Sequence, residues 1–123
     1  KLPVSYGLDY WCESKGSSFW MEVKCRSFGI NKYETLLLSA SKLRMGAALS
    51  LATNRPFVLV FAMTDSVYSH TWDKNKVYDV RFGTIAEPQL PEDSEPYIHL
   101  HKKDLTCLSD SALGFDRDEL GLI

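Results

Sequence analysis

The chain has 123 residues, 45% of them hydrophobic, and a formal net charge of −2 at pH 7. This size fits one compact domain, since domains typically span about 50 to 250 residues. The charge excludes a protein that coats nucleic acid, because such binding needs many Lys and Arg side chains to neutralise phosphates. No apolar run approaches the roughly 20 residues that cross a bilayer, which predicts a soluble domain with no membrane partner.

Three cysteines, Cys12, Cys25 and Cys107, form an odd set without Cys-x-x-Cys spacing. This pattern argues against a disulfide framework and against a structural zinc site. We therefore expect reduced thiols and a cytoplasmic, intracellular location. The chain begins with Lys1 rather than Met, and we expect it to be part of a longer protein.

The first predicted element is a half-buried strand over residues 4–11, in which apolar and polar residues alternate. Asp9 falls on its polar side. Residues 13–18 contain turn chemistry, and Gly16 is able to take a positive φ. The chain is therefore expected to reverse here into a second, antiparallel strand.

That second strand, residues 19–26, carries two different faces. Alternate residues share a side, so the apolar face holds Phe19, Met21, Val23 and Cys25, and the polar face holds Trp20, Glu22, Lys24 and Arg26. We expect the first face to be core. In the right register, Asp9 and Glu22 meet on the second face, which then forms a chemical site. The alternative is a solvated face with cross-strand ion pairs, each contributing about 0.2 to 1 kcal/mol.

Residues 27–38 are compatible with a helical stripe or with a short buried strand from Thr35 to Leu38. A helix is then predicted over about 39–53, capped by Ser39 or Ser41 and ended by Asn54. Its apolar stripe is Leu43, Ala47 and Leu51, and small residues at 46–48 allow close approach to a sheet. Lys42 and Arg44 oppose the helix dipole, so they are either solvated or near an anionic group.

The second half of the chain is predicted to form mainly strands. The apolar run 57–63 predicts a central strand covered on both faces, and 67–72 and 77–82 complete a meander. Residues 87–96 predict a loop, 97–101 a last short strand, and 109–123 an acidic tail. We expect a single domain over 1–123, with a core at 1–86, the loop at 87–96, and the C-terminal strand and tail at 97–123.

His99 and His101, two residues apart, either share a metal or form a surface pair, and the sequence offers no third ligand at a recognisable spacing. His70 is expected to be structural or exposed. Neither a glycine-rich phosphate loop nor a Gly-x-Ser-x-Gly elbow is present.

One constellation is left. Asp9, then Glu22-Val23-Lys24 after a hairpin, a helix and a buried strand resemble the active-site core of the PD-(D/E)XK nucleases, the restriction-endonuclease-like superfamily. The resemblance covers about residues 5–72. It implies an α/β (α+β) fold, with a central mixed β-sheet of about five strands and the packing helix at about 39–53. Leu8 stands where the named motif has proline.

The resemblance implies a Mg²⁺-dependent (or Mn²⁺-dependent) nuclease that hydrolyses phosphodiester bonds in DNA. Asp9 and Glu22, with the backbone carbonyl of Val23, would hold the metal. Hard cations suit this reaction because they neutralise charge and lower the pKa of an attacking water. Lys24 would orient the water or stabilise developing charge. Lys42 resembles the additional Gln or Lys that many members place near the site.

Further basic residues would surround this acidic pair. Arg26, Lys32 and Arg44 are expected to contact the nucleic acid, as a local basic rim on an acidic domain. Tyr10 and Trp20 either offer stacking surface for bases or are packed in the protein.

Two other hypotheses stay open. The chain is a catalytically silent nuclease-fold domain that binds nucleic acid or a protein partner, or it is an accessory module of a larger viral or mobile-element protein. In the second case the tail from Ser109 belongs to its contact surface. The sequence leaves open whether the domain forms a homodimer.

Overall fold

The structure is a computed structural model that describes residues 1–3, 7–82 and 96–108. Its elements in the first half are β1 (Tyr10–Ser14), β2 (Ser17–Cys25), β3 (Thr35–Ser39), α1 (Ala40–Thr53) and β4 (Phe57–Ala62). Those in the second half are β5 (Val67–Thr71), β6 (Asp79–Phe82), β7 (Pro96–His101), the 3₁₀ turn η3 (Lys102–Asp104) and β8 (Thr106–Leu108).

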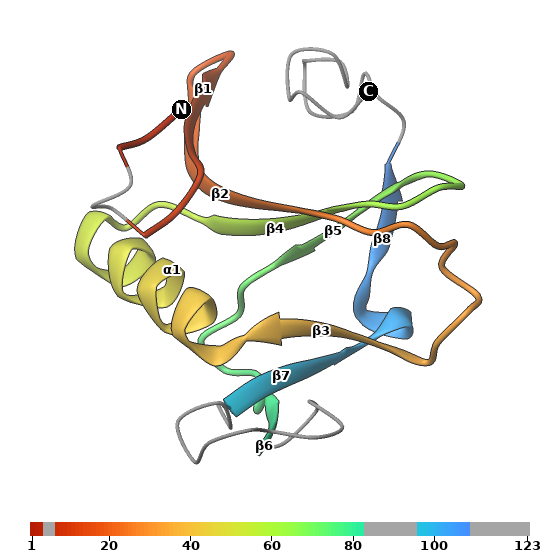
Figure 1. The fold of residues 1–123 in the computed structure, drawn as a ribbon. Coiled ribbons are helices and arrows are strands. Elements are labelled where there is room, and N and C mark those ends of the chain that lie inside the picture. The colour runs from red at the N-terminus through yellow and green to blue at the C-terminus, as the bar shows by residue number, and fades with distance from the viewer. Residues whose placement is uncertain (4–6, 83–95, 109–123) are drawn as a thin grey trace.

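The strands form two sheets (Figure 1). The larger sheet has five strands in the order β1-β2-β4-β5-β8, and it is mixed because β2 and β4 run parallel while the other neighbours are antiparallel. The smaller sheet is antiparallel, in the order β3-β7-β6. The predicted α+β fold with a mixed sheet of about five strands and one packing helix is confirmed. The second sheet is an addition that the sequence pattern did not predict.

The main hydrophobic core lies between the two sheets, and α1 packs against both of them. In Figure 1 the helix stands at one end of the space between β2–β4 and β3–β7. The larger sheet contributes Trp20, Phe57, Leu59 and Phe61, the smaller sheet Leu36, Leu38, Ile98 and Leu100, and the helix Leu43. The two sheets and the helix therefore share one core.

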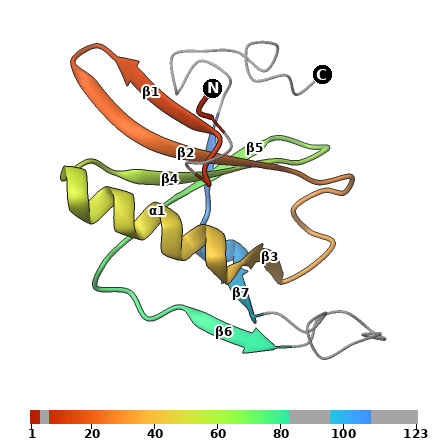
Figure 2. The same cartoon turned by 60° about the vertical axis from the view of Figure 1, so that its left-hand side comes forward.

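The first hairpin closes at Lys15 and Gly16, both with positive φ, and pairs Tyr10 with Met21 (Figure 2). The predicted strand over 4–11 is wrong in its start. Gly7 has φ 73° and residues 7–9 form a bend, so regular pairing begins only at Tyr10; residues 4–6 lie outside the described part of the chain. Asp9 therefore lies in the segment that leads into β1, immediately before the strand.

The apolar face of β2 is part of a core, as predicted, but the alternative of a solvated second face is wrong at the middle of the strand. Trp20, on the second face, is 7% exposed and belongs to the main core, whereas Met21 on the first face belongs to a smaller cluster with Val60 and Val67. Glu22 is buried as well. Both sides of the strand are covered at its middle, because the second sheet packs over the side that alternation alone assigns to solvent.

The helix is confirmed at Ala40–Thr53, with Asn54 in the left-handed conformation at its end. Ser39 is the N-cap residue, but its side chain makes no capping hydrogen bond and instead meets Ser41 Oγ at 2.8 Å. The predicted stripe is only partly right, since Leu51 is 64% exposed. Gly46 takes the buried position instead, so close to Phe57 that an added Cβ atom would clash with its ring.

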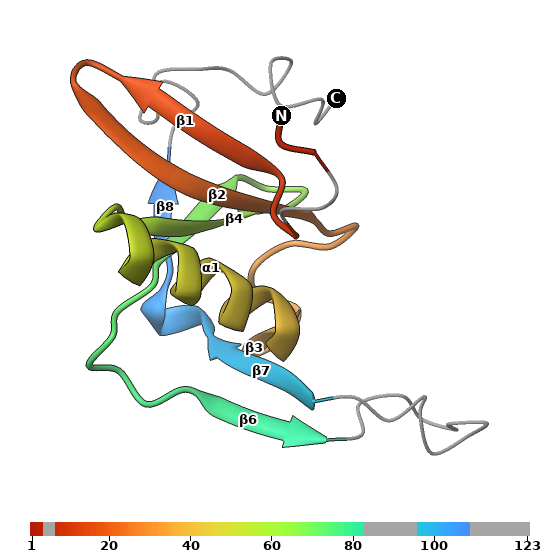
Figure 3. The same cartoon turned by 90° about the vertical axis from the view of Figure 1, so that its left-hand side faces the viewer.

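The segment before the helix is β3, which confirms the strand interpretation of Thr35–Leu38 over the helical one. The central strand is confirmed as β4, and β5 follows it. The predicted meander is wrong: β6 leaves the larger sheet and pairs with β7 in the smaller one (Figure 3). The last short strand is confirmed as β7, but a further strand, β8, returns to β5.

Several remaining predictions concern the second half of the chain. The predicted loop over 87–96 lies outside the described residues except for Pro96, which begins β7, and the tail 109–123 lies outside them entirely. His70 is structural, since its ring nitrogens lie 3.1 Å from the Asp104 carbonyl oxygen and 2.7 Å from the Tyr78 hydroxyl. All three cysteines are free thiols. None of the described helices is long and apolar enough to cross a membrane.

Candidate active site

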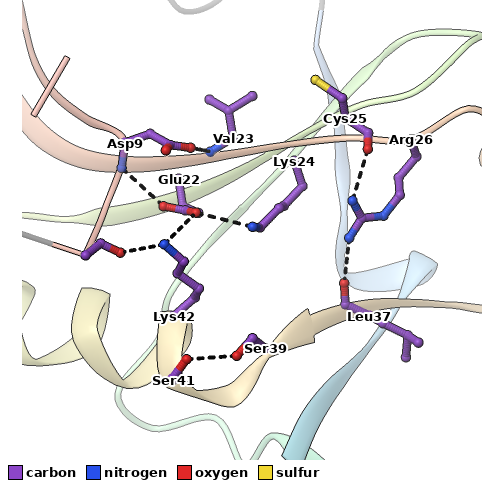
Figure 4. Close-up of polar contacts among 11 residues, drawn as sticks. Asp9, Glu22, Val23, Lys24, Cys25, Arg26, Leu37, Ser39, Ser41 and Lys42 are labelled. Atoms are coloured by element: carbon purple, nitrogen blue, oxygen red, sulfur yellow. Dashed lines mark hydrogen bonds and ion pairs between the residues drawn. The ribbon is translucent and has the colours of Figure 1, made fainter. Parts of the chain in front are cut away.

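The carboxylate of Glu22 is the buried charge around which this site is built. It projects from the middle of β2 into the space below the larger sheet, toward the first turn of α1 (Figure 4). Glu22 as a whole is only 1% exposed. Burying an ionised carboxylate is costly unless it is paired and hydrogen-bonded, so the neighbours of Glu22 decide its state.

Asp9 is the first of these neighbours. Continuing the β1–β2 register one residue beyond Tyr10 and Met21 places Asp9 opposite Glu22. The backbone N–H of Asp9 donates to Glu22 Oε2 at 3.2 Å, and the backbone N–H of Val23 donates to Asp9 Oδ2 at 3.0 Å. The two acidic residues are thus interlocked by backbone hydrogen bonds, and the register that the predicted site requires is present.

Two lysines approach the same oxygen of Glu22 from different elements. Lys24 Nζ, from β2, lies 3.4 Å from Glu22 Oε1, and Lys42 Nζ, from the first turn of α1, lies 3.5 Å from it. Lys42 also donates to the carbonyl oxygen of Gly7 at 3.0 Å. The helix therefore contributes the Lys42 cation to the site, although a positive charge near the start of a helix interacts unfavourably with the helix dipole.

Burial raises the pKa of the Glu22 carboxyl above its ordinary value, and the negative charge of Asp9 raises it further. The positive charges of Lys42 and Lys24 lower this pKa, and a hydrogen bond from Lys24 lowers it further. A carboxyl with such opposed neighbours changes its proton affinity strongly when a cation arrives or leaves. Carboxyls with shifted pKa values are concentrated at functional sites.

The donor set fits a hard divalent cation. Mg²⁺ is usually bound through one or two carboxylates and keeps several of its waters, and Asp9 with Glu22 supplies two carboxylates. In the part of the chain that the structure describes, no three His, Cys, Asp or Glu side chains gather into a possible metal group. Other metal positions would fall to backbone oxygen, water or substrate. The role of the Val23 carbonyl stays a prediction.

The three predicted nucleic-acid contacts occupy different places. Arg26 follows β2 and donates from Nη2 to the Leu37 carbonyl oxygen at 2.9 Å, bridging to β3 (Figure 4). Lys32 lies in the connection to β3, 5.6 Å from the centre of the Phe28 ring and 5.5 Å from that of Tyr33. Arg44 is exposed on α1. The idea that Trp20 offers a stacking surface is wrong, because Trp20 is buried and donates to Thr53 Oγ1.

The two histidines that suggested a metal lie on β7. His101 Nδ1 accepts the backbone N–H of Lys103, and its Nε2 lies 3.6 Å from Glu34. His99 lies between Leu37 of β3 and Asp79 of β6. These surroundings provide no metal group within the described ranges.

Two backbone groups that position side chains of the site were not predicted from the sequence. The carbonyl of Gly7 positions Lys42, and that of Leu37 positions Arg26. Backbone carbonyls leave no residue-type signal. At Gly7 the only hint is a glycine two residues before the acid, which adopts φ 73° and so turns the chain toward the helix.

The fold and the site define a class: an α+β domain with a mixed sheet, a restriction-endonuclease-like core, and an acidic pair flanked by lysines. A family model described as "Phage putative PDDEXK endonuclease" matches residues 1–108. The chain therefore belongs to this family of PD-(D/E)XK nucleases. The search of curated proteins and the search of solved structures each found no match.

Proposed function

We propose that the chain is a divalent-metal-dependent nuclease that hydrolyses phosphodiester bonds in DNA, with Asp9 and Glu22 as the carboxylates that hold Mg²⁺ or Mn²⁺. The observation that carries the proposal is the buried Glu22 carboxylate, interlocked with Asp9 and flanked by two lysines. A purely structural ion pair does not need this arrangement, since burying charges is often no better than burying apolar side chains of similar volume. The free thiols fit a reducing, intracellular place of action.

A bound cation would supply charge neutralisation and activation of water, as hard divalent ions do in phosphoryl chemistry. The chain's own groups divide the remaining tasks. Lys24 lies on the same side of β2 as Glu22, and its side chain is 29% exposed, so its ammonium can reach a phosphate oxygen. It would stabilise the charge that develops there.

The Lys42 ammonium is tethered by two contacts, one to the Glu22 carboxylate and one to the Gly7 carbonyl oxygen. This tether makes it a positioning group. It holds the Glu22 carboxylate in place and fixes the segment before β1 that carries Asp9.

One observation favours a second candidate function. Lys24 and Lys42 already neutralise Glu22 without a metal, as a catalytically silent nuclease-fold domain would require. Such a domain would bind nucleic acid or a protein equally well in EDTA, and metal would not change its stability.

The test is cleavage of labelled DNA in Mg²⁺, in Mn²⁺ and in EDTA. We expect metal-dependent cleavage that falls at least about 100-fold in Glu22→Gln and in Asp9→Asn, the scale of losing one charge-stabilising group. Asp104→Asn is the matched control, because Asp104 also pairs with a lysine, Lys76, but lies outside the candidate site. Full activity in Glu22→Gln would exclude the proposed role, and cleavage in EDTA would exclude the metal.

A further inference from the structure

A pocket of about 510 Å³ opens beside the candidate active site. It lies between the β2–β3 connection, β3 and β7, and its lining includes Arg26, Phe28, Tyr33, Glu34, Leu37 and His99. Ligand pockets in proteins commonly measure about 300 to 1,000 Å³, with apolar walls and a few polar groups. This pocket has that composition.

One residue of the pocket lining, His99, carries a polar atom without a hydrogen-bond partner in the described part of the chain. His99 Nε2 is buried and makes no hydrogen bond among the described residues. Buried polar atoms in native proteins are nearly always hydrogen-bonded, so each exception calls for an explanation. A ring nitrogen of histidine accepts or donates one hydrogen bond according to its tautomer, and a ligand would supply the missing partner once the ring turns to expose this atom to the pocket.

Aromatic side chains form another wall. The rings of Phe28 and Tyr33 lie 5.0 Å apart in an edge-to-face arrangement, and Lys32 lies over both. Tyr33 is 50% exposed, although it is a large hydrophobic residue. An exposed aromatic beside cations is typical of surfaces on which nucleic-acid bases stack.

Arg26 connects the pocket to the acidic pair. It follows Glu22 and Lys24 at successive alternate positions, so all three side chains fall on one side of the extended chain. At about 3.3 Å per residue, Arg26 lies roughly 13 Å from Glu22 along the strand. A phosphate at Glu22 and a base in the pocket would therefore belong to nucleotides only a few steps apart.

We infer that this pocket receives one unpaired base of the substrate strand, so that the preferred substrate is single-stranded or carries an unpaired nucleotide within a few nucleotides of the scissile phosphate. The inference rests on the proposed nuclease function. A base inside a duplex cannot reach such a pocket without leaving the stack, which costs a few kcal/mol, and a base that is already unpaired avoids that cost. The base edge would bond to His99 Nε2, its ring would contact Tyr33, and Arg26 with Lys32 would face the phosphates.

The test is an abasic scan read by fluorescence anisotropy. A labelled single-stranded oligonucleotide is compared with versions that lack one base at successive positions, and with a blunt duplex, in EDTA and again in Ca²⁺. We expect removal of the base at one position to weaken binding about tenfold, the scale of one base–aromatic contact. Removal elsewhere should change binding about twofold or less, because phosphate contacts do not depend on the base.

Two variants link that position to the pocket. Tyr33→Ala removes an exposed ring, and His99→Leu removes the unpartnered nitrogen. Each should flatten the abasic profile and bring the affinities for single strand and blunt duplex together. Val77→Ala, at a position that is 93% exposed and outside the pocket lining, should keep the profile of the unchanged protein.

The outcomes separate this inference from the nuclease proposal. An abasic profile without metal-dependent cleavage would support the pocket and contradict the nuclease. Cleavage with a flat profile, or with a profile that Tyr33→Ala and His99→Leu leave unchanged, would overturn the pocket alone. Absence of binding in both EDTA and Ca²⁺ would also overturn it.

Discussion

Glu22 and Glu34 are two carboxylates with nearly the same immediate neighbours and opposite surroundings. Glu22 lies 3.4 and 3.5 Å from the ammonium groups of Lys24 and Lys42, and Glu34 lies 3.4 and 3.6 Å from Lys102 and His101. The Glu22 side chain is 2% exposed and that of Glu34 is 72% exposed. Distance alone does not distinguish them, whereas burial does.

This difference in burial explains why only the Glu22 cluster is a candidate active site. Around Glu34, water screens the charges, and exposed ion pairs contribute about 0 to 1 kcal/mol. Around Glu22, the two sheets and α1 exclude water, so each neighbouring charge acts strongly on the carboxyl. A similar arrangement of basic side chains around a carboxylate is a surface detail at Glu34 and the proposed metal site at Glu22.

The largest effect on DNA cleavage should come from the lysines of the buried cluster, which consists of Glu22, Lys24 and Lys42. Lys24→Met is expected to reduce metal-dependent DNA cleavage by about 100-fold or more, because it removes a cation at the developing charge. Lys102→Met, the corresponding change beside Glu34, should leave the rate within about twofold, as expected of a solvated pair. Single-turnover rates of purified, folded variants measure both, and equal effects would remove the distinction between the two clusters.

A change of packing should disturb the buried cluster from a distance. In Gly46→Ala the added Cβ would clash with the Phe57 ring, so either that buried ring or α1 must shift. We expect the free energy of unfolding to fall by about 1 to 3 kcal/mol, the usual cost of overpacking, although alanine favours helix by about 1 kcal/mol. Urea unfolding checks this.

Leu51→Ala is the control for that change, since it alters the same helix at an exposed position. It should change stability by about 0.5 kcal/mol or less. If Gly46→Ala were as mild as the control, α1 would not be seated against β4 as described, and the position of Lys42 beside Glu22 would lose its support.

The pH dependence of stability should carry the sign of the raised pKa of Glu22. Because the pKa is raised in the folded state, the folded protein binds a proton more readily than the unfolded chain. Without metal, the wild type should therefore gain stability relative to Glu22→Gln as the pH falls from neutrality toward the ordinary value of 4.5, and should lose that advantage as the pH rises through the raised pKa.

Divalent metal should reverse this trend. A cation that binds only the folded state stabilises it in proportion to the logarithm of its concentration, and it favours the ionised carboxylate. At neutral pH, Mg²⁺ or Mn²⁺ should raise the melting temperature of the wild type and leave that of Glu22→Gln unchanged. An equal shift in both proteins would indicate binding elsewhere.

The smallest effect is expected at Glu34 itself. Glu34→Gln should change the free energy of unfolding by about 0.5 kcal/mol or less, because its ion pairs are exposed. Thermal or urea unfolding at low and high salt would show it. A loss as large as that of a buried pair would mean that exposure does not separate the two clusters.

Local patterns predicted much of the site. Asp9 and Glu22 meet because the turn at Lys15 and Gly16 sets the hairpin register, and both the turn chemistry and the alternation are visible in the sequence. The helix at Ala40–Thr53 was also predictable from its end signals and small residues. Lys42 was a candidate through the resemblance to the family, since its place on the helix alone also allowed a solvated side chain.

Long-range pairing was not predictable in the same way. β6 pairs with β7 across residues 83–95, and nothing local to Asp79–Phe82 distinguishes that partner from β5. For the same reason the sequence could not show that a second sheet covers the Glu22 side of β2. A strand pattern tells which residues share a face, but the burial of that face depends on elements far along the chain.

The most direct test of the central claim is a crystal soaked with Mn²⁺, examined by anomalous scattering. The proposed site predicts a peak between the carboxylates of Asp9 and Glu22, with no such peak in the Glu22→Gln protein. A peak beside His99 and His101 instead, or no peak while Lys24 and Lys42 stay on Glu22, would contradict the metal-dependent nuclease.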